Sequence, residues 1–369
     1  MFTQYLTRFY ARLVANVDGP LLLITCLLMG AGLATVFSAT YDTGSRAISQ
    51  GLNMGLGLVI MWLVAQLSPQ KLMRFAVPLY VGGVVLLVLV YLMGIKVNGA
   101  RRWLSLFGLM RIQPSEILKV AMPLMLAWYF HKYEATLKLR HYLIAGLLLI
   151  VPFGLIAKQP DLGTAILVGA AGFYVIFFAG LPWKIIIGMI IAGATAAPFI
   201  WTILHDYQRR RILTLIDPTS DPLGAGYHII QSTIAIGSGG TFGKGWLEGT
   251  QTHLEFIPER HTDFIFAVFS EEHGLLGCSI LLLLYLMLIV RGLMITAHAS
   301  TLFSRVMAGS ITLSFFTYVF VNMGMVSGIL PVVGIPLPFM SYGGTALISL
   351  FCGIGILMSI HSHRMLVKR

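Results

Sequence analysis

The sequence contains ten apolar runs, each long enough to cross a lipid bilayer as a single helix. A bilayer hydrocarbon core is about 30 Å thick and requires about 20 apolar residues in helical form. Helix is required because lipid cannot satisfy an exposed backbone. The runs are continuous rather than alternating, which excludes a transmembrane barrel. Their approximate ranges are 20–39, 51–67, 75–93, 115–131, 141–158, 162–180, 183–204, 264–290, 305–328 and 341–360.

The composition supports this interpretation. Hydrophobic residues make up 57% of the chain and charged residues only 11%, and the mean hydropathy is +0.85. A soluble domain of this composition would expose large apolar patches to water. The three cysteines all fall inside apolar runs and show no disulfide or metal spacing. The sequence therefore predicts an all-α polytopic membrane protein, with residues 1–369 forming one membrane domain.

The distribution of basic residues predicts the orientation. With ten spans both chain termini share one side of the membrane, and placing them in the cytoplasm follows the positive-inside tendency. The long loop 205–263, between the seventh and eighth spans, is then extracytoplasmic. Residues 1–19 carry apolar residues at helical spacing and two arginines on another face, which indicates an interfacial helix on anionic lipid. A disordered basic tail is the alternative. The residues concerned are Phe2, Leu6, Phe9, Leu13, Val17, Arg8 and Arg12.

Two of the predicted outer loops are unusually basic. The short loop between the third and fourth spans opposes the topology signal, so its cations require another explanation. Phosphate is the simplest partner, because Arg and Lys are its usual ligands; anionic lipid headgroups are the alternative. The cations are Lys96, Arg101, Arg102 and Arg111 in the short loop, and Arg209, Arg210, Arg211, Lys244 and Arg260 in the long one.

Charges inside the apolar runs are costly unless they are paired or hydrated. Glu116 and Lys119 are three residues apart in the fourth run, so they share a helical face and can pair. Lys158 and Asp161 flank the helix-breaking Pro160 and form a second polar group. A third group, Glu271 to His273, lies inside the eighth run. For each of these groups a buried salt bridge that only fixes helix packing is the alternative to a functional role.

Two further stretches are too irregular to span a membrane. Residues 221–246 read DPLGAGYHIIQSTIAIGSGGTFGKGW, which predicts a short amphipathic helix followed by a glycine-rich loop that approaches its neighbours closely. Residues 328–345 read GILPVVGIPLPFMSYGGT and hold three prolines among apolar residues. This second stretch predicts a re-entrant or interfacial loop on the outer side.

Four co-linear motifs resemble those of the SEDS family, the shape, elongation, division and sporulation proteins. They are QPSEILK at 113–119, KQPDLGTA at 158–165, PERHTDFIFA at 258–267 and PVVGIPLPFMSYGGT at 331–345. The resemblance covers nearly the whole chain and includes the long loop between the seventh and eighth spans. Arg260 before His261, together with DPLGAGYHIIQS, resembles the rod-shape branch of the family rather than the division branch.

The resemblance implies that the chain polymerises lipid II into glycan strands on the outer face of the cytoplasmic (inner) membrane during cell elongation. It also implies a class B penicillin-binding protein as the transpeptidase partner. The family's essential carboxylate maps onto Asp263. The competing functions are a flippase for lipid-linked precursors, which requires a polar path across the membrane, and a non-catalytic scaffold for the partner enzyme.

The chemistry of polymerisation suits the residues around Asp263. Displacement at an anomeric carbon requires a base near the acceptor hydroxyl and positive charge near the departing diphosphate. Asp263 is the candidate base, and an N-capping aspartate is the alternative. A divalent cation, Mg²⁺ or Mn²⁺, could assist it. The candidate substrate-binding residues are Arg101, Arg102, Arg209, Arg210, Lys244, Arg260 and His261.

Overall fold

The computed structural model describes residues 16–40, 44–97, 100–106, 110–204, 206–221, 224–254, 256–257 and 259–364. The predicted interfacial helix therefore lies almost entirely outside the described residues. Residues 16–18 are not helical, and the first described helix starts at Gly19.

Each of the ten predicted spans corresponds to one long helix. Seven of these helices have the length and apolar composition needed to cross a membrane. The prediction of an all-α polytopic membrane protein is thus confirmed. The ten helices are α2 (Gly19–Ala39), α3 (Ser45–Ala65), α4 (Pro69–Met93), α5 (Pro114–Lys132), α6 (Leu139–Lys158), α7 (Leu162–Phe178), α8 (Trp183–Ile203), α12 (Ile265–Ala297), α13 (Leu302–Val326) and α14 (Gly344–Ser362).

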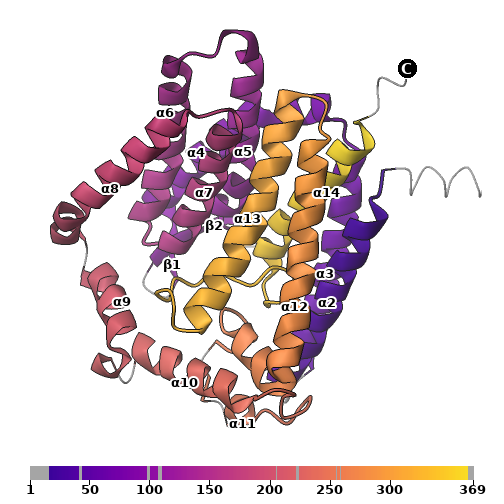
Figure 1. Cartoon of the computed structure of the whole chain (residues 1–369), viewed down its shortest axis with the longest axis vertical. Helices are drawn as coiled ribbons and strands as arrows, with labels where there is room; N and C mark the ends of the chain where they lie inside the picture. The colour runs from indigo at the N-terminus through magenta and orange to yellow at the C-terminus, as the bar shows by residue number, and fades with distance from the viewer. Residues whose placement is uncertain are drawn as a thin grey trace, which may run out of the picture.

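The helices form a bundle whose first and last spans meet at one end (Figure 1). Asp18, the N-cap of α2, accepts hydrogen bonds from the Arg291 guanidinium at 2.5 and 3.1 Å. His361 Nε2, near the end of α14, lies 3.2 Å from the same carboxylate. The start of α2, the second half of α12 and the end of α14 are thereby joined at what we call the termini end. The opposite end, which we call the loop end, carries α10, α11 and β1.

A small antiparallel sheet, which was not predicted from the sequence, lies between α4 and α5 in the chain. Its strands are β1 (Ile95–Val97), β2 (Ala100–Leu106) and β3 (Met110–Ile112). Lys96 pairs with Arg101 across the first ladder, and Leu104 pairs with Ile112 across the second. The strands contain β-branched and aromatic residues, such as Ile95, Val97 and Trp103, which favour extended backbone. Arg101 and Arg102 are consecutive residues of β2, so their side chains point to opposite faces of the sheet.

The long connection from α8 to α12 is largely helical. It contains α9 (Asp206–Ile216), the 3-10 turn η2 (Pro218–Ser220), α10 (Ala225–Ser238) and α11 (Thr250–His253). A second 3-10 turn, η1 (Glu134–Thr136), lies between α5 and α6. The helix α10 matches the predicted short helix. The glycines after it do approach α12 closely, because a side-chain carbon on Gly243 would lie 2.0 Å from the Glu272 carbonyl oxygen. Gly274 has a φ of +62° and interrupts α12 at this contact.

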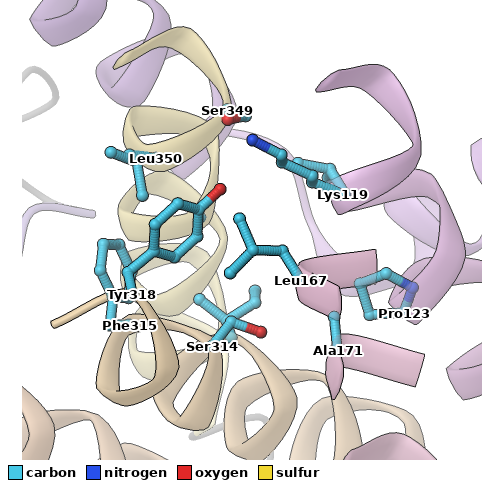
Figure 2. A pocket seen from close by; sticks show the side chains of 12 residues that line it. Lys119, Pro123, Leu167, Ala171, Ser314, Phe315, Tyr318, Ser349 and Leu350 are labelled. Atoms are coloured by element: carbon cyan, nitrogen blue, oxygen red, sulfur yellow. The ribbon is translucent and has the colours of Figure 1, made fainter. Parts of the chain in front are cut away.

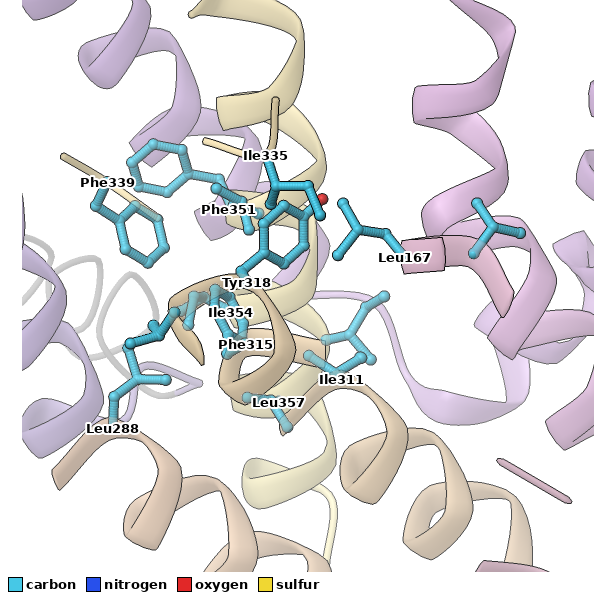
Figure 3. Close-up of a cluster of buried hydrophobic side chains, with 14 of the residues drawn as sticks. Leu167, Leu288, Ile311, Phe315, Tyr318, Ile335, Phe339, Phe351, Ile354 and Leu357 are labelled. Atoms are coloured by element: carbon cyan, nitrogen blue, oxygen red, sulfur yellow. The ribbon is translucent and has the colours of Figure 1, made fainter. Parts of the chain in front are cut away.

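A cluster of aromatic rings lies in the core of the bundle. Phe315 on α13 stacks on Phe339 with centroids 5.8 Å apart, and Phe339 meets Phe351 on α14 at 5.1 Å. Phe339 and Phe351 have no exposed surface. Figure 3 shows these rings between α12, α13 and α14. Phe339 belongs to the irregular segment 327–343, so the core fixes this segment between α13 and α14.

Candidate functional site

Asp263 lies two residues before α12, at the loop end of the bundle. Its backbone carbonyl accepts a hydrogen bond of 2.9 Å from the Asn322 amide on α13. The N-cap of α12 is Phe264, and no side chain hydrogen-bonds the free N–H groups there. The alternative that Asp263 serves as an N-cap is therefore not what the structure shows. No donor among the described residues hydrogen-bonds its carboxylate, which leaves that group available to a ligand.

The Asp263 side chain borders a polar cavity of about 310 Å³. Segments that are far apart in the sequence converge on it: β2, the start of α7, α9, α10, the residues before α12, and the 327–343 segment. The lining residues are Arg102, Pro160, Asp161, Leu162, Arg211, His228, Glu259, Asp263, Phe264, Val332, Val333 and Gly334.

The electrostatics of this cavity favour a proton acceptor. Burial and the nearby Glu259 carboxylate raise the pKa of Asp263 to about 6, while Arg211 opposes the shift. A base is most effective when its pKa lies near the working pH. Asp263 is therefore largely ionised at pH 7 yet more basic than an ordinary aspartate.

Glu259 is held beside Asp263 by a tight turn. Its Oε2 accepts a hydrogen bond of 2.8 Å from Thr262 Oγ1, and its φ of +50° is in the left-handed region. That conformation is unfavourable for a residue with a side chain and tends to occur at functional sites.

Gly334 makes room for the Asp263 carboxylate. Its φ is +74°, and a side-chain carbon at this position would lie 3.1 Å from Asp263 Oδ2. Glycine therefore meets two requirements here, a left-handed backbone and a close approach. The neighbouring backbone is fixed because Asn322 also donates to the Ile335 carbonyl at 2.7 Å.

The predicted polar group at Pro160 is present with a different partner. Arg102 Nη2 donates to the Pro160 carbonyl at 2.5 Å, and its Nη1 lies 4.0 Å from Asp161 Oδ1. Asp161 also accepts from Gln113 at 3.1 Å and caps α7 through the Thr164 N–H. Lys158, which was predicted to form this group with Asp161, is exposed at the end of α6. The cation beside Asp161 is Arg102.

The remaining candidate cations do not line the cavity. Arg209 donates to the carbonyls of Trp201 and Thr202 at the end of α8, and Arg260 Nε donates to the Ala39 carbonyl at 2.8 Å. Arg101 and Arg210 are exposed, and the side chains of Lys96 and Arg111 lie outside the described part of the structure.

Lys244 is paired in another part of the loop end. Its Nζ lies 2.7 Å from Glu271 Oε1, and Glu271 is fully buried. The same carboxylate accepts from the backbone N–H groups of Gln251 and Thr252. These contacts tie the glycine-rich loop and α11 to α12.

His261 lies next to the cavity rather than in its wall. Its two ring nitrogens are 3.3 and 3.4 Å from Arg46 Nη1, and its ring packs against Tyr342. Burial and the Arg46 charge lower the pKa of His261. Its backbone carbonyl accepts from the Tyr342 N–H at 2.8 Å, which helps to fix the segment before Asp263.

Three ionisable residues that line the cavity were not among the predicted site residues: Arg211, His228 and Glu259. Glu259 is in the same PERHTD stretch as Asp263, and Arg211 is in a run of three arginines, so both carried a usable signal. His228 carried none beyond its place in the long loop.

The cavity can hold a divalent cation only with help from a substrate. No group of three or more His, Cys, Asp or Glu side chains in the described ranges is arranged to bind a metal ion. Asp263 and Glu259 nevertheless repel each other across one cavity, and a cation would relieve this. Mg²⁺ commonly takes one or two carboxylates together with substrate phosphates and water, so these two residues fit a metal brought by a phosphate-bearing ligand.

The predicted contact between Glu116 and Lys119 is present. Lys119 Nζ lies 2.7 Å from Glu116 Oε1, and Ser349 Oγ donates to the other carboxylate oxygen at 3.1 Å. The Lys119 ammonium is 5.4 Å from the centre of the Tyr318 ring. Figure 2 shows Lys119, Tyr318 and Ser349 converging above apolar residues that include Leu167 and Phe315. This network joins α5, α13 and α14 inside the bundle.

Together, the fold and the cavity define a polytopic membrane protein with an acidic site at one end of its helical bundle. Residues 19–366 match the model of the cell cycle protein family that comprises FtsW, RodA and SpoVE. The chain belongs to this family, the SEDS family.

Two named relatives support membership of this family. The chain is 52% identical over 358 residues to the peptidoglycan glycosyltransferase MrdB of Escherichia coli (strain K12), with 96% of each chain covered. It is 35% identical over 361 residues to a probable peptidoglycan glycosyltransferase FtsW of Geobacter metallireducens, covering 94% of this chain and 95% of the relative.

Two solved structures share the fold. One belongs to a study of structural coordination of polymerization and crosslinking by a peptidoglycan synthase complex; its TM-score is 0.83 at 35% identity, covering 95% of this chain and 99% of that one. The other is the rod shape determining protein RodA of Thermus thermophilus, with a TM-score of 0.72 at 30% identity, covering 95% and 98%.

Proposed function

We propose that the chain is a peptidoglycan glycosyltransferase that polymerises lipid II into glycan strands during rod-shaped growth. The observation that carries the proposal is the Asp263 carboxylate, which has a raised pKa, lies at the border of a polar cavity and makes no hydrogen bond within the described residues. Relatives of the chain bear the names of peptidoglycan glycosyltransferases.

The reaction follows from this geometry. Asp263 accepts the proton of an acceptor sugar hydroxyl, and that oxygen forms a bond to the anomeric carbon of the donor. The bond from this carbon to the diphosphate oxygen breaks, and the diphosphate departs with the electron pair. Positive charge must meet this leaving group. Arg211 lines the cavity, and the exposed Arg101 and Arg210 belong to the two basic segments at the loop end. A divalent cation, when bound, would supply further positive charge.

The orientation in the membrane determines which substrate can reach the site. We place the loop end at the outer face of the cytoplasmic membrane and both termini in the cytoplasm. The apolar spans then hold the isoprenoid tail while the cavity receives the sugar. We propose a class B penicillin-binding protein as the partner, because one structural neighbour is part of a peptidoglycan synthase complex.

Transport of the lipid-linked precursor remains the competing function. A flippase requires a polar path from one face to the other. The buried rings of Phe315, Phe339 and Phe351 pack on one another in the core of the bundle. This packing favours polymerisation at one face.

Reconstitution tests the proposal directly. The purified chain, its class B penicillin-binding protein and lipid II are combined in detergent or vesicles, and glycan strands are resolved on a gel. We expect polymer from the wild type and none from Asp263→Asn. Equal polymer from both, or none from either while lipid II crosses the vesicle membrane, would overturn the proposal.

A further inference from the structure

His228 on α10 is fixed next to the catalytic aspartate. Its ring stacks on Phe264, the residue after Asp263, with centroids 5.4 Å apart and an interplanar angle of 21°. The helix that carries it is anchored one turn later, where Ser232 Oγ donates to the Val326 carbonyl of α13 at 2.8 Å. The ring is thus held in one place at the cavity wall.

Only one nitrogen of this ring is available to a ligand. Nδ1 of His228 is enclosed and has no hydrogen-bond partner among the described residues. An enclosed N–H without an acceptor is expensive, so Nδ1 carries the lone pair and Nε2 carries the proton. Because His228 lines the cavity, Nε2 is the ring nitrogen left to donate to a ligand there. Burial lowers the pKa of His228, against the opposing charges of Glu259 and Asp221, which agrees with a neutral ring.

The charge balance of the cavity indicates what this donor meets. Arg102 is already matched by Asp161 and by the Pro160 carbonyl. Arg211 is left to balance two carboxylates, Asp263 and Glu259. The wall therefore carries no excess of positive charge, which a diphosphate would require. A neutral, hydroxyl-rich group suits it better, since hydroxyl oxygens accept from N–H donors and carboxylates accept from hydroxyls.

We propose that this cavity holds the acceptor sugar and that His228 Nε2 donates a hydrogen bond to an oxygen of that sugar, which orients the reacting hydroxyl toward Asp263. The proposal deepens the function proposed above and rests on it. The diphosphate of the donor then lies at the rim of the cavity, toward Arg211 and the exposed cations, rather than in the acceptor position. His228 becomes a substrate-binding residue that sets acceptor geometry, and Asp263 remains the base.

Variants separate this role from simple packing against Phe264. His228→Phe keeps an aromatic ring for the stack and removes the donor, whereas His228→Gln keeps a donor and loses the ring. His273→Phe is the matched control, because His273 also stacks on a phenylalanine, Phe269, at 4.4 Å, and does not line the cavity. Folding of each variant is checked by its melting temperature and by binding of the transpeptidase partner.

The first measurement is polymerisation of lipid II by the full complex. We expect His228→Phe to lose about tenfold to a hundredfold in rate, as is typical when a polar ligand group is left unpaired. His228→Gln should retain more activity than His228→Phe, and His273→Phe should match the wild type. Wild-type rates in His228→Phe, or a greater loss in His228→Gln than in His228→Phe, would overturn the role of His228. A wild type that makes no polymer would instead refute the proposed function.

The second measurement uses ligands without a lipid. The N-acetylated disaccharide of lipid II, free of diphosphate, and inorganic pyrophosphate are compared by thermal shift on the same four proteins. We expect the disaccharide to stabilise the wild type, His228→Gln and His273→Phe, and to have a smaller effect on His228→Phe. Absence of a shift in the wild type, equal shifts in all four, or a His228-dependent shift with pyrophosphate instead would overturn the assignment of this cavity to the acceptor sugar.

Discussion

The buried amide of Asn322 on α13 holds the backbone of Asp263 in place: its Nδ2 donates to the Asp263 carbonyl at 2.9 Å and to the Ile335 carbonyl at 2.7 Å. One side chain thus joins the segment that carries Asp263, the helix α13 and the 327–343 segment. The position of the Asp263 carboxylate therefore depends on a residue 59 positions later in the sequence.

Replacement of Asn322 should impair both stability and activity. Asn322→Asp places an acceptor against two carbonyl oxygens, and Asn322→Leu leaves both carbonyls unpaired, at a cost of about 1–3 kcal/mol in the free energy of unfolding. We expect a lower melting temperature and a larger loss of polymerisation in Asn322→Asp than in Leu. Thermal unfolding and the lipid II assay at a temperature where each variant is folded measure the two effects. Unchanged activity in both would show that Asp263 needs no such support.

Asp263→Asn should fold, insert and bind its partner, yet make almost no glycan. The amide cannot accept the proton, and a positioned base is typically worth about 10²–10⁴-fold in rate. Asp217→Asn, at the exposed N-cap of the turn η2, is the control and should polymerise normally. Substantial polymer from Asp263→Asn would remove Asp263 from the chemistry.

The pKa of Asp263 predicts opposite effects of pH on activity and stability. Polymerisation should rise with pH through about 6, because the base must be ionised. A carboxyl whose pKa is raised in the folded state contributes stability below its unfolded pKa and loses it as pH rises through the folded value. The asparagine of Asp263→Asn cannot ionise. The free energy of unfolding of this variant should therefore exceed that of the wild type by an amount that grows between pH 4 and 6 and then levels off, at no more than about 3 kcal/mol.

Melting temperatures of the two proteins from pH 4 to 8, with Asp217→Asn as the reference, measure this difference. A stability difference between Asp263→Asn and the wild type that shrinks as pH rises would contradict the raised pKa of Asp263.

The Glu116–Lys119 pair should be costly to break from either side. Removing one partner of a buried ion pair typically destabilises a protein by about 3–5 kcal/mol, because the other charge remains buried. Glu116→Gln and Lys119→Met should each lower stability, and the double variant should lose less than the sum of the two. Wild-type stability and activity in both single variants would show that the contact is dispensable.

The proposed orientation can be tested by cysteine labelling. In a background without Cys26, Cys278 and Cys352, a cysteine at Ser220 should react with an impermeant thiol reagent in intact cells. A cysteine at Ser362 should react only after permeabilisation. The reverse pattern would place the Asp263 cavity in the cytoplasm, where the substrate's sugar could not be joined to the outer wall.

Much of the architecture was readable from the sequence. Apolar runs of about 20 residues determine membrane helices because lipid offers the backbone no hydrogen bonds. The Glu116–Lys119 contact was also predictable, since residues three apart share a face of any helix. The sheet of β1 to β3 was missed because three short strands give almost no periodic signal.

Some features of the candidate site were also predictable from the sequence, and others were not. Asp263 was identified through its motif, and Glu259 stands beside it in the same stretch. The sequence could not tell that Lys244 is paired with Glu271 or that Arg102 is matched by Asp161, because a charge carries no mark of its partner. Those pairings arise when segments more than 20 residues apart are packed together.

By itself, then, the sequence determined which segments enter the membrane and which carboxylate could act as the base, since both depend on local composition or a contiguous motif. Only the tertiary structure decided the wall of the cavity, where Arg102, Arg211, His228 and Gly334 meet Asp263 from different segments. The physical reason is that burial, pKa and unpaired donors are properties of the space between side chains, and helix packing creates that space.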